Sequence, residues 1–244
     1  MWGFVWQGKP YEGLTCDAIE WIASYNGGSV VDASGKIDID NPRAIKALQE
    51  AHSWIGKISP PEVLNFDEEG ARAVFQTGDA VFMRNWPYAW GLANAAGSPI
   101  KDKVGVIALP RGGNDGHGAA ALGGQQLAVS KYSKNVDAAV DLVLYLSGLE
   151  EQKRRSITGG FNPTIASLYK DQEMISANPF QAELYSTFMN ATARPSSPTH
   201  GRYNQVSSEF WNAVHATLTG EKDASHGVKD LDARLHAINQ SGNW

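Results

Sequence analysis

Hydrophobic residues recur along the chain at two spacings, which predict helices and strands in different places. Apolar residues three or four apart predict a helix, and the clearest case is the series Val206, Phe210, Val214 and Leu218. Short apolar runs between turn residues predict strands. The helices expected on these grounds span about 12–25, 42–55, 67–78, 135–146 and 231–238, with shorter ones before 192 and a long one through 206–218. The strands expected are 4–6, 80–83, 104–109 and 122–129, and a short hairpin is expected at 29–39.

Two helix starts are marked by residues that typically begin helices. Asn41 and Pro42 form a strong start, because Asn is a good N-cap and Pro suits the first helical position. Asp67 opens the acidic run Asp67-Glu68-Glu69, whose charge favours the positive end of a helix dipole. Both helices are therefore predicted from local signals alone.

The order of the elements indicates the fold class. Strands alternate with helices over about the first half of the chain, which is typical of an α/β domain, whereas the C-terminal part is helical. The helix at 135–146 is apolar on nearly every side, and such a helix is normally buried all round. Its apolar members include Ala138, Val140, Leu142, Val143, Leu144 and Leu146. The strand at 80–83 is also expected to be buried.

Composition narrows the class of protein. The chain has 244 residues, of which 42% are hydrophobic and 19% charged, ordinary values for a globular protein of one large domain or two modest ones. The formal net charge is −5 and the largest basic cluster is Lys153-Arg154-Arg155, so nucleic acid is not an expected partner. No apolar run reaches the roughly 18 residues of a membrane span. The single cysteine, Cys16, cannot form an internal disulfide and is expected to be a small buried hydrophobe.

Motifs of the common enzyme classes are missing from the sequence. The glycine-rich stretch RGGNDGHG lacks both phosphate-binding patterns and is interpreted as a connection. The histidines are scattered, with no HExxH, and there is no GxSxG elbow. The carboxylates at 67–69 could serve glycoside hydrolysis, but a helix start accounts for them better. We therefore predict no catalytic residue, no metal and no cofactor.

The stretch FMRNWPYAWG crowds three large rings, Trp86, Tyr88 and Trp90, around Pro87, where neither a strand nor a helix is expected to continue. The rings either fill a core at a corner or line a surface that meets a flat, partly apolar ligand. A sugar is such a ligand, since its C–H face stacks on aromatic rings and its hydroxyls need fixed polar partners. The residues alone leave both alternatives open.

Two other places have groups suited to a ligand. Gly123, Gly124 and Gln125 lie at the start of an expected strand, where glycines let the backbone approach a ligand closely. Arg194 is expected outside any helix, with several N–H donors and no obvious ion partner nearby.

Several runs of the chain, in order, resemble extracellular solute-binding proteins of sugar ABC transporters, and most of all the trehalose/maltose-binding proteins. The runs are FVWQGKPYEGLTCDAIEW, GDAVFMRNWPYAW, KVGVIALP, LGGQQLAVSKYSKNVDAAVDLVLYL and ARPSSPTHGRYNQVSSEFWNAVHATLTGE. The resemblance implies a periplasmic-binding-protein type II-like α/β fold, in which two lobes joined by hinge strands close on a sugar. It covers nearly the whole chain, so it is more specific than any one run.

The resemblance also implies a division into lobes. Residues 1–112 and 161–244 are expected to belong to the second, C-terminal lobe, and 116–160 to a segment of the first, N-terminal lobe. The chain opens on an expected strand, without a signal peptide or most of a first lobe. We therefore expect a C-terminal portion of a longer receptor that is periplasmic or extracellular.

The resemblance carries over to particular residues. Tyr88 matches the ring of the NxPxAW pattern that stacks on sugar, and Trp86 lies beside it, while Trp90 is expected to be the buried, structural ring. The other expected sugar-binding residues are Gly123 and Gly124 at the cleft, Arg194 of the ARP pattern and, more weakly, Gln7 and Tyr11. Where relatives usually have GGW, this chain has Gln125, so an amide replaces a stacking ring.

The function expected is a receptor, not an enzyme, that binds a trehalose- or maltose-type disaccharide and delivers it to the membrane permease of an ABC importer. The alternative is a carbohydrate-active enzyme or a lectin-like module. The apolar helix at 135–146 adds an expectation about this chain alone, in which the helix could be disordered, collapse onto the chain's own second lobe, or be buried against a second copy. We favour self-association, because disorder would leave an aggregation-prone patch and collapse lacks a matching groove.

Overall fold

The computed structural model describes residues 1–239 and 244, and the chain forms two compact units. Unit 1 comprises Met1–Trp86, Ala108–Leu122 and Asn190–Trp244. Unit 2 comprises Pro87–Ile107 and Gly123–Met189. The assignment of 1–112, 116–160 and 161–244 to two lobes of a larger fold stays a prediction, and residues 240–243 of the last segment lie outside the described residues.

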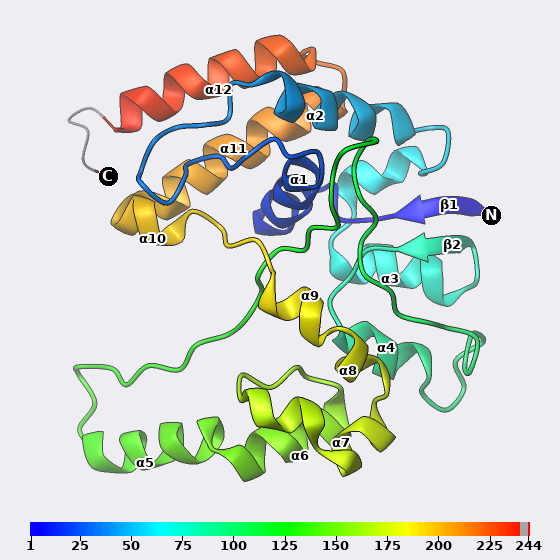
Figure 1. Ribbon diagram of the computed structural model, residues 1–244, viewed down its shortest axis with the longest axis vertical. Coiled ribbons are helices and arrows are strands. Elements are labelled where there is room, and N and C mark those ends of the chain that lie inside the picture. The colour runs from blue at the N-terminus through cyan, green and yellow to red at the C-terminus, as the bar shows by residue number, and fades with distance from the viewer. Residues whose placement is uncertain (240–243) are drawn as a thin grey trace. The chain divides into compact units, whose positions relative to one another are not determined.

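Unit 1 combines a small parallel sheet with a group of packed helices (Figure 1). Strand β1 (Trp2–Val5) pairs in parallel with β2 (Ala80–Met83), with Phe4 opposite Phe82, and α3 packs against both strands. The helices are α1 (Glu12–Ser24), α2 (Pro42–Trp54), α3 (Glu68–Gln76), α10 (Ser196–Thr199), α11 (Tyr203–Leu218) and α12 (Ala224–Ile238), with 3-10 turns η1 (Pro61–Asn65) and η3 (His200–Arg202).

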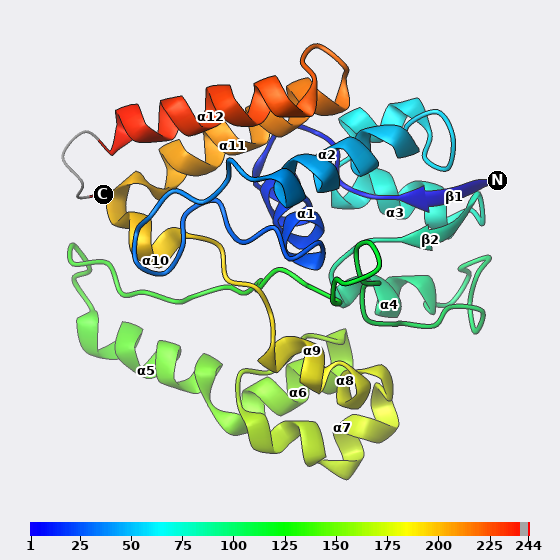
Figure 2. The same ribbon diagram turned by 45° about the horizontal axis from the view of Figure 1, so that its top comes forward.

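Helix α1 is the centre of the core of unit 1. All its residues except Glu12 are buried, including the free Cys16, as predicted. It packs against α2 and α11, and α11 and α12 lie side by side in both views (Figure 2). The apolar series of α11, predicted from its spacing, is buried throughout. The rings of Trp6 and Trp54 flank Trp21 of α1 edge-on, at centroid distances of 4.9 and 5.5 Å.

The predicted helix starts are confirmed. The Asn41 side chain accepts hydrogen bonds from the backbone N–H groups of Arg43 (3.1 Å) and Ala44 (2.9 Å). Asp67 caps α3 by accepting from the N–H of Gly70 at 3.0 Å. Helix α12 begins at Ala224, earlier than predicted, because Asp223 provides a cap that the apolar spacing did not reveal.

Unit 2 is mostly helical. Its helices are α4 (Tyr88–Ala93), α5 (Val136–Ser147), α6 (Leu149–Gly159), α7 (Gln172–Ala177), α8 (Phe180–Glu183) and α9 (Tyr185–Met189), with the 3-10 turn η2 (Ala166–Lys170). A small core forms where η2 meets α7, around Leu168, Tyr169 and Met174. Because α4 begins directly after Pro87, the expectation that no helix continues there was wrong: Pro87 occupies the cap position and needs no N–H.

The strands predicted at 104–109 and 122–129 were wrong. Neither segment forms a strand among the described residues, and their side chains are largely exposed, Ile107 at 74% and Leu127 at 52%. A strand needs a neighbour that supplies hydrogen bonds, and β1–β2 is the only named sheet in the part of the chain that the structure describes. The hairpin at 29–39 reduces to a single antiparallel bridge between Val31 and Ile37.

Two predictions of burial were also wrong. Strand β2 exposes Val81 and Phe82 by 52% and 58%, because the small core packed on this sheet, around Val5, Ala71 and Ala80, does not include them. Helix α5 forms where predicted, but none of its residues is buried. Its main packing partner among the described elements is α6, and it lies beyond α6, away from α7–α9 (Figures 1 and 2).

Across the described ranges, 1–239 and 244, we find no helix with both the length and the apolar character needed to cross a membrane.

Candidate ligand-binding site

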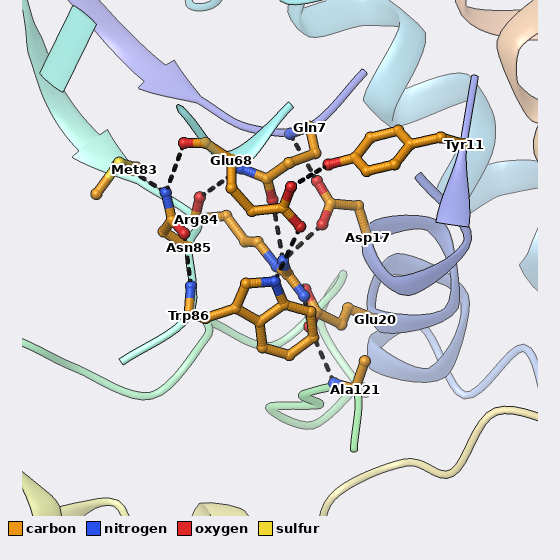
Figure 3. A network of polar contacts seen from close by, with 10 residues as sticks. All are labelled: Gln7, Tyr11, Asp17, Glu20, Glu68, Met83, Arg84, Asn85, Trp86 and Ala121. Carbon is orange, nitrogen blue, oxygen red and sulfur yellow. Dashed lines mark hydrogen bonds and ion pairs between the residues drawn. The ribbon is translucent and has the colours of Figure 1, made fainter. Parts of the chain in front are cut away.

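A buried arginine directly after β2 organises a polar network in unit 1 (Figure 3). Arg84 is 4% exposed, and its guanidinium donates to both carboxylate oxygens of Glu20, from Nε at 3.0 Å and from Nη2 at 2.7 Å. Its Nη1 donates to the side-chain oxygen of Gln7 at 2.9 Å. Helix α1 presents Asp17 and Glu20 to this arginine together, because residues three apart lie on one face of a helix.

Asp17 completes the charged centre of the network. Its Oδ2 accepts from the backbone N–H of Gln7 at 2.9 Å. Its Oδ1 lies 2.9 Å from Nε of Arg84, an ion-pair distance, but has no hydrogen-bond partner among the described residues. Burial and the neighbouring Glu20 raise the pKa of Asp17, although Arg84 opposes them. Burial lowers the pKa of Arg84, but Asp17 and Glu20 outweigh it and raise that pKa, so the guanidinium stays charged.

The network ties distant parts of the chain together. Gln7 is fully buried, and its amide nitrogen donates to the backbone oxygen of Arg84 at 3.0 Å. The backbone N–H of Ala121 donates to Glu20 at 2.9 Å, which holds the segment Ala108–Leu122 against α1. Both polar ends of the Gln7 side chain are therefore engaged by Arg84.

Two of the predicted sugar-binding rings meet at one carboxylate (Figure 3). The Tyr11 hydroxyl donates to Oε2 of Glu68 at 2.6 Å, and the Trp86 indole N–H donates to Oε1 of Glu68 at 3.0 Å. The Arg84 guanidinium lies over the Trp86 ring, 4.2 Å from its centroid, in a cation–π contact. Burial, and then the hydrogen bond to Glu68, raise the pKa of Tyr11, so its hydroxyl remains a donor.

Arg194 lies in a second polar cluster of unit 1, so the expectation that it has no ion partner was wrong. Its Nη1 donates to Glu12 at 2.7 Å. The hydroxyls of Tyr203 and Ser207 donate to the same carboxylate, that of Ser207 at 2.6 Å. Glu12 was overlooked because it is 182 positions from Arg194 in sequence, and packing of α11 against α1 brings the two regions together.

The remaining predicted residues belong to unit 2. Tyr88 is the first residue of α4 and is half-buried. Gly123, Gly124 and Gln125 lie in a segment that forms neither helix nor strand, and a Cβ added at Gly124 would meet no atom within 4 Å. Trp90, expected to be the buried ring, is half-buried and packs against Phe180 with ring centroids 5.0 Å apart.

The structure thus brings Gln7, Tyr11 and Trp86 into one network and places Arg194 in another cluster of the same unit. The residues that connect them were not predicted to be functional. Asp17 and Glu20 could have been noticed in the sequence, since they are charged residues within a largely apolar helix and are buried with it. Nothing in the sequence distinguished Glu68, because a helix start already explained its charge.

Within the described residues there is no group of three or more histidine, cysteine, aspartate or glutamate side chains arranged to hold a metal ion. The carboxylates Asp17 and Glu20 instead face the guanidinium of Arg84.

Comparison with known proteins identifies the class of protein. Residues 7–153 match the family model of bacterial extracellular solute-binding proteins. A probable ABC transporter-binding protein of Deinococcus radiodurans is 52% identical over 240 residues, which cover 98% of this chain and 57% of that protein. The chain therefore belongs to the bacterial extracellular solute-binding protein family.

Solved structures agree on the fold. The maltose-bound MalE3 of T. maritima is 43% identical, with a TM-score of 0.91, over 98% of this chain and 61% of its own. The GacH receptor of Streptomyces glaucescens, solved unliganded and with acarbose, is 20% identical and supports the fold alone, with a TM-score of 0.81 over 98% of this chain and 60% of its own. The fold is of the periplasmic-binding-protein type II class, and the chain spans about three fifths of the length of these proteins.

Proposed function

We propose that the chain is the larger part of a sugar-binding receptor that delivers its ligand to the membrane permease of an ABC importer, in the periplasm or outside the cell. The observation that carries the proposal is the pair of rings Tyr11 and Trp86, held at one carboxylate beside a buried arginine. Fixed aromatic rings with polar groups at their edges suit the apolar face and hydroxyl rim of a sugar. The receptor binds and releases its ligand without chemical change.

The ligand we propose is a trehalose- or maltose-type disaccharide. The support is the 43% identity to a protein solved with maltose, together with aromatic rings at positions 11, 86 and 88. Gln125, an amide where a stacking ring is usual, bears on which disaccharide is preferred. The proposed contact residues are Gln7, Tyr11, Trp86, Tyr88, Gly123, Gly124, Gln125 and Arg194.

Tyr88 and Trp90 provide a direct test in the full-length receptor. Tyr88→Ala is expected to weaken maltose binding by roughly 1–3 kcal/mol, the contribution of a well-placed stacked ring. Trp90→Ala is expected to lower the free energy of unfolding by about 1–2 kcal/mol, because its ring is only half-buried against Phe180, and to leave affinity nearly unchanged. Calorimetric titration with maltose and trehalose measures the first effect and urea denaturation the second. Unchanged affinity in Tyr88→Ala would remove Tyr88 from the site.

The 244-residue chain alone is expected to bind maltose in the millimolar range or more weakly. Receptors of this kind gain affinity by enclosing the ligand between two walls, and this chain has about three fifths of the length of its relatives. Titration of this chain followed by NMR measures such weak affinity. A micromolar dissociation constant would show that the chain contains a complete site.

A carbohydrate-active enzyme or lectin-like module is the alternative. A glycosidase needs two carboxyl groups that face the sugar, whereas Asp17 and Glu20 are buried against Arg84. Incubation with maltose and trehalose, with products detected by mass, separates the two proposals. Glucose release that scales with protein concentration would favour the enzyme.

For this chain by itself we further propose self-association through α5. The exposed apolar side chains of this helix include Val140, Leu142, Leu144 and Tyr145. The helix carries its two acidic residues, Asp137 and Asp141, in its first half, so an antiparallel pair of α5 helices keeps these charges apart and brings apolar faces together. In the full receptor, we expect the remainder of the first lobe to cover this face.

A further inference from the structure

The contacts of Glu68 are not explained by its place at the start of a helix. It is the first residue of α3, and Asp67 already caps that helix. Both oxygens of its carboxylate accept from aromatic side chains, Oε2 from Tyr11 and Oε1 from Trp86 (Figure 3). The two donors come from places 75 positions apart in sequence, and Glu68 is the group that they share.

Glu68 is also tied to Trp86 through the backbone. Its backbone oxygen accepts from the side-chain nitrogen of Asn85 at 3.0 Å, and the side-chain oxygen of Asn85 accepts from the N–H of Trp86 at 2.8 Å. The main chain and the indole of Trp86 are therefore both positioned relative to the start of α3.

The orientation of Trp86 determines which of its faces a ligand can use. Arg84 covers one face at 4.2 Å, and Arg84 is itself fixed by Glu20 and Gln7. A ligand that stacks on a ring held at its edge by Glu68 and covered on one face by Arg84 would have to use the opposite face. Holding a ring in its binding orientation beforehand reduces the entropy lost on binding.

The orientation of the Tyr11 ring is also fixed by its neighbours. A Cβ at Gly13 would lie 2.2 Å from atoms of the Tyr11 ring, so a glycine is needed for the ring to lie against the start of α1. With the ring in that place, its hydroxyl reaches Glu68 at 2.6 Å.

We propose that Glu68 is a positioning residue that holds Trp86 and Tyr11 together in the orientation that binds a sugar. This inference rests on the proposed function and adds to it a residue that is not expected to stack on the ligand itself. Glu69 is a natural comparison, because it lies in the same first turn but pairs with Arg72.

Three variants, Glu68→Gln, Glu68→Ala and Glu69→Ala, should affect the contacts of Trp86 and Tyr11 differently. An indole N–H can only donate, whereas a phenol hydroxyl can donate or accept. In Glu68→Gln, the amide oxygen can accept from Trp86 while the amide nitrogen donates to Tyr11, so both contacts persist. Glu68→Ala removes both contacts, and Glu69→Ala removes a neighbouring charge without touching either ring.

The first experiment needs no ligand and uses the 244-residue chain. NMR of the Trp86 indole N–H and of the Tyr11 ring carbon that bears the hydroxyl reports each contact, with Trp86→Phe and Tyr11→Phe assigning the signals. In Glu68→Ala, the indole N–H is expected to exchange with solvent at least about tenfold faster. The pKa of Tyr11 is expected to fall, since Glu68 contributes to raising it. Glu69→Ala should leave both signals unchanged, and Glu68→Gln should keep the indole protected. Unchanged signals in Glu68→Ala would overturn the proposal.

The second experiment measures maltose binding by calorimetric titration of the full-length receptor and its variants, because the 244-residue chain alone is expected to bind only in the millimolar range or more weakly. Glu68→Ala is expected to bind about tenfold more weakly, Glu68→Gln within about threefold of the parent, and Glu69→Ala like the parent. Equal affinity in Glu68→Ala would overturn the binding role even if the rings had moved. If the full-length receptor binds no disaccharide, the proposed function fails and the binding role of Glu68 fails with it, while the first experiment still decides whether Glu68 orients the rings.

Discussion

At the scale of single residues, Arg84 links the stability of unit 1 to the orientation of the candidate site. Its guanidinium satisfies Glu20 and Gln7, lies at ion-pair distance from Asp17, and covers one face of Trp86. A buried charge is tolerated when such partners are present, and removing one partner leaves the others buried and uncompensated. The aromatic contact is thus built on an ionic cluster that the fold itself requires.

Arg84→Met is expected to lower the free energy of unfolding by about 3–5 kcal/mol at neutral pH, because Asp17 and Glu20 lose their buried cation. Arg43→Met is the matched control, since the Arg43–Asp115 pair is largely exposed and should contribute less than about 1 kcal/mol. Urea denaturation of both variants measures the difference. Equal losses in the two variants would contradict the central role of Arg84.

The stability of Arg84→Met is expected to depend on pH, because removing Arg84 changes the pKa of Asp17. The pKa of Asp17 is raised in the folded protein, so the folded state holds the proton more tightly than the unfolded state does. Stability therefore falls as pH rises above about 4, the ordinary value for an aspartate, through the raised pKa. Loss of Arg84, which opposes this rise, should make the fall steeper. Arg84→Met should accordingly be less impaired at pH 5 than at pH 7.5, and an equal deficit at both would contradict this mechanism.

At the scale of elements, features governed by neighbouring residues could be predicted and features governed by distant ones could not. The caps Asn41 and Asp67 bond to N–H groups two or three residues away, so sequence alone placed them. The expected strand at 104–109 needed a partner from elsewhere in the chain, and its apolar run carried no information about one. An apolar run indicates what a segment could bury, not whether another segment is there to cover it.

The candidate site follows the same division. Tyr11, Trp86 and Arg194 could be selected from the sequence, because their residue types suit sugar binding and they match the family resemblance. The groups that hold them, Glu68 and Glu12, are ordinary surface-type residues whose role depends on contacts 18 to 195 positions away in sequence. No local pattern separates such a glutamate from a solvated one.

Glu12 joins the start of α1 to the first turns of α11 and to Arg194, and its removal tests that junction. Its carboxylate accepts from Arg194, Tyr203 and Ser207. Glu12→Ala is expected to cost about 1–3 kcal/mol of unfolding free energy, the range for hydrogen bonds to a charged group. Arg194→Met should cost less in the Glu12→Ala background than alone, by at least about 0.5 kcal/mol, because the two act together.

Urea denaturation of the four chains in this cycle measures the coupling. Glu209→Ala on α11 provides a control, because Glu209 forms an ion pair with Nε of Arg234 at 3.0 Å and both side chains are partly exposed. This substitution should cost about 1 kcal/mol or less. Strictly additive losses for Glu12 and Arg194 would show that the pair does not act as a unit.

At the scale of the whole molecule, the chain passes between its two units four times. The predicted site residues are consequently divided, with Gln7, Tyr11, Trp86 and Arg194 in unit 1 and Tyr88, Gly123, Gly124 and Gln125 in unit 2. Residues that are neighbours in sequence, such as Trp86 and Tyr88, thus belong to different units.

The exposed face of α5 leads to the last prediction, which concerns the 244-residue chain in solution. Leu142, Leu144 and Tyr145 are each more than half exposed. Burying an aliphatic or aromatic side chain contributes roughly 1.5–3 kcal/mol, so covering several of them offsets the entropy lost when two chains associate. The chain is therefore expected to form a dimer or larger species at micromolar concentration, measured by light scattering coupled to size-exclusion chromatography.

A substitution on this face should reverse the association. Leu144→Glu is expected to give a monomer, because a charge cannot be buried in the paired apolar face without a partner. Ser176→Glu on α7, also an exposed position, adds the same charge away from α5 and should associate like the parent. Hydrogen exchange of the α5 amides distinguishes the remaining possibility. A parent chain that is monomeric, with these amides strongly protected, would mean that α5 is covered by its own chain, because exchange from a helix with no buried residue should otherwise be fast.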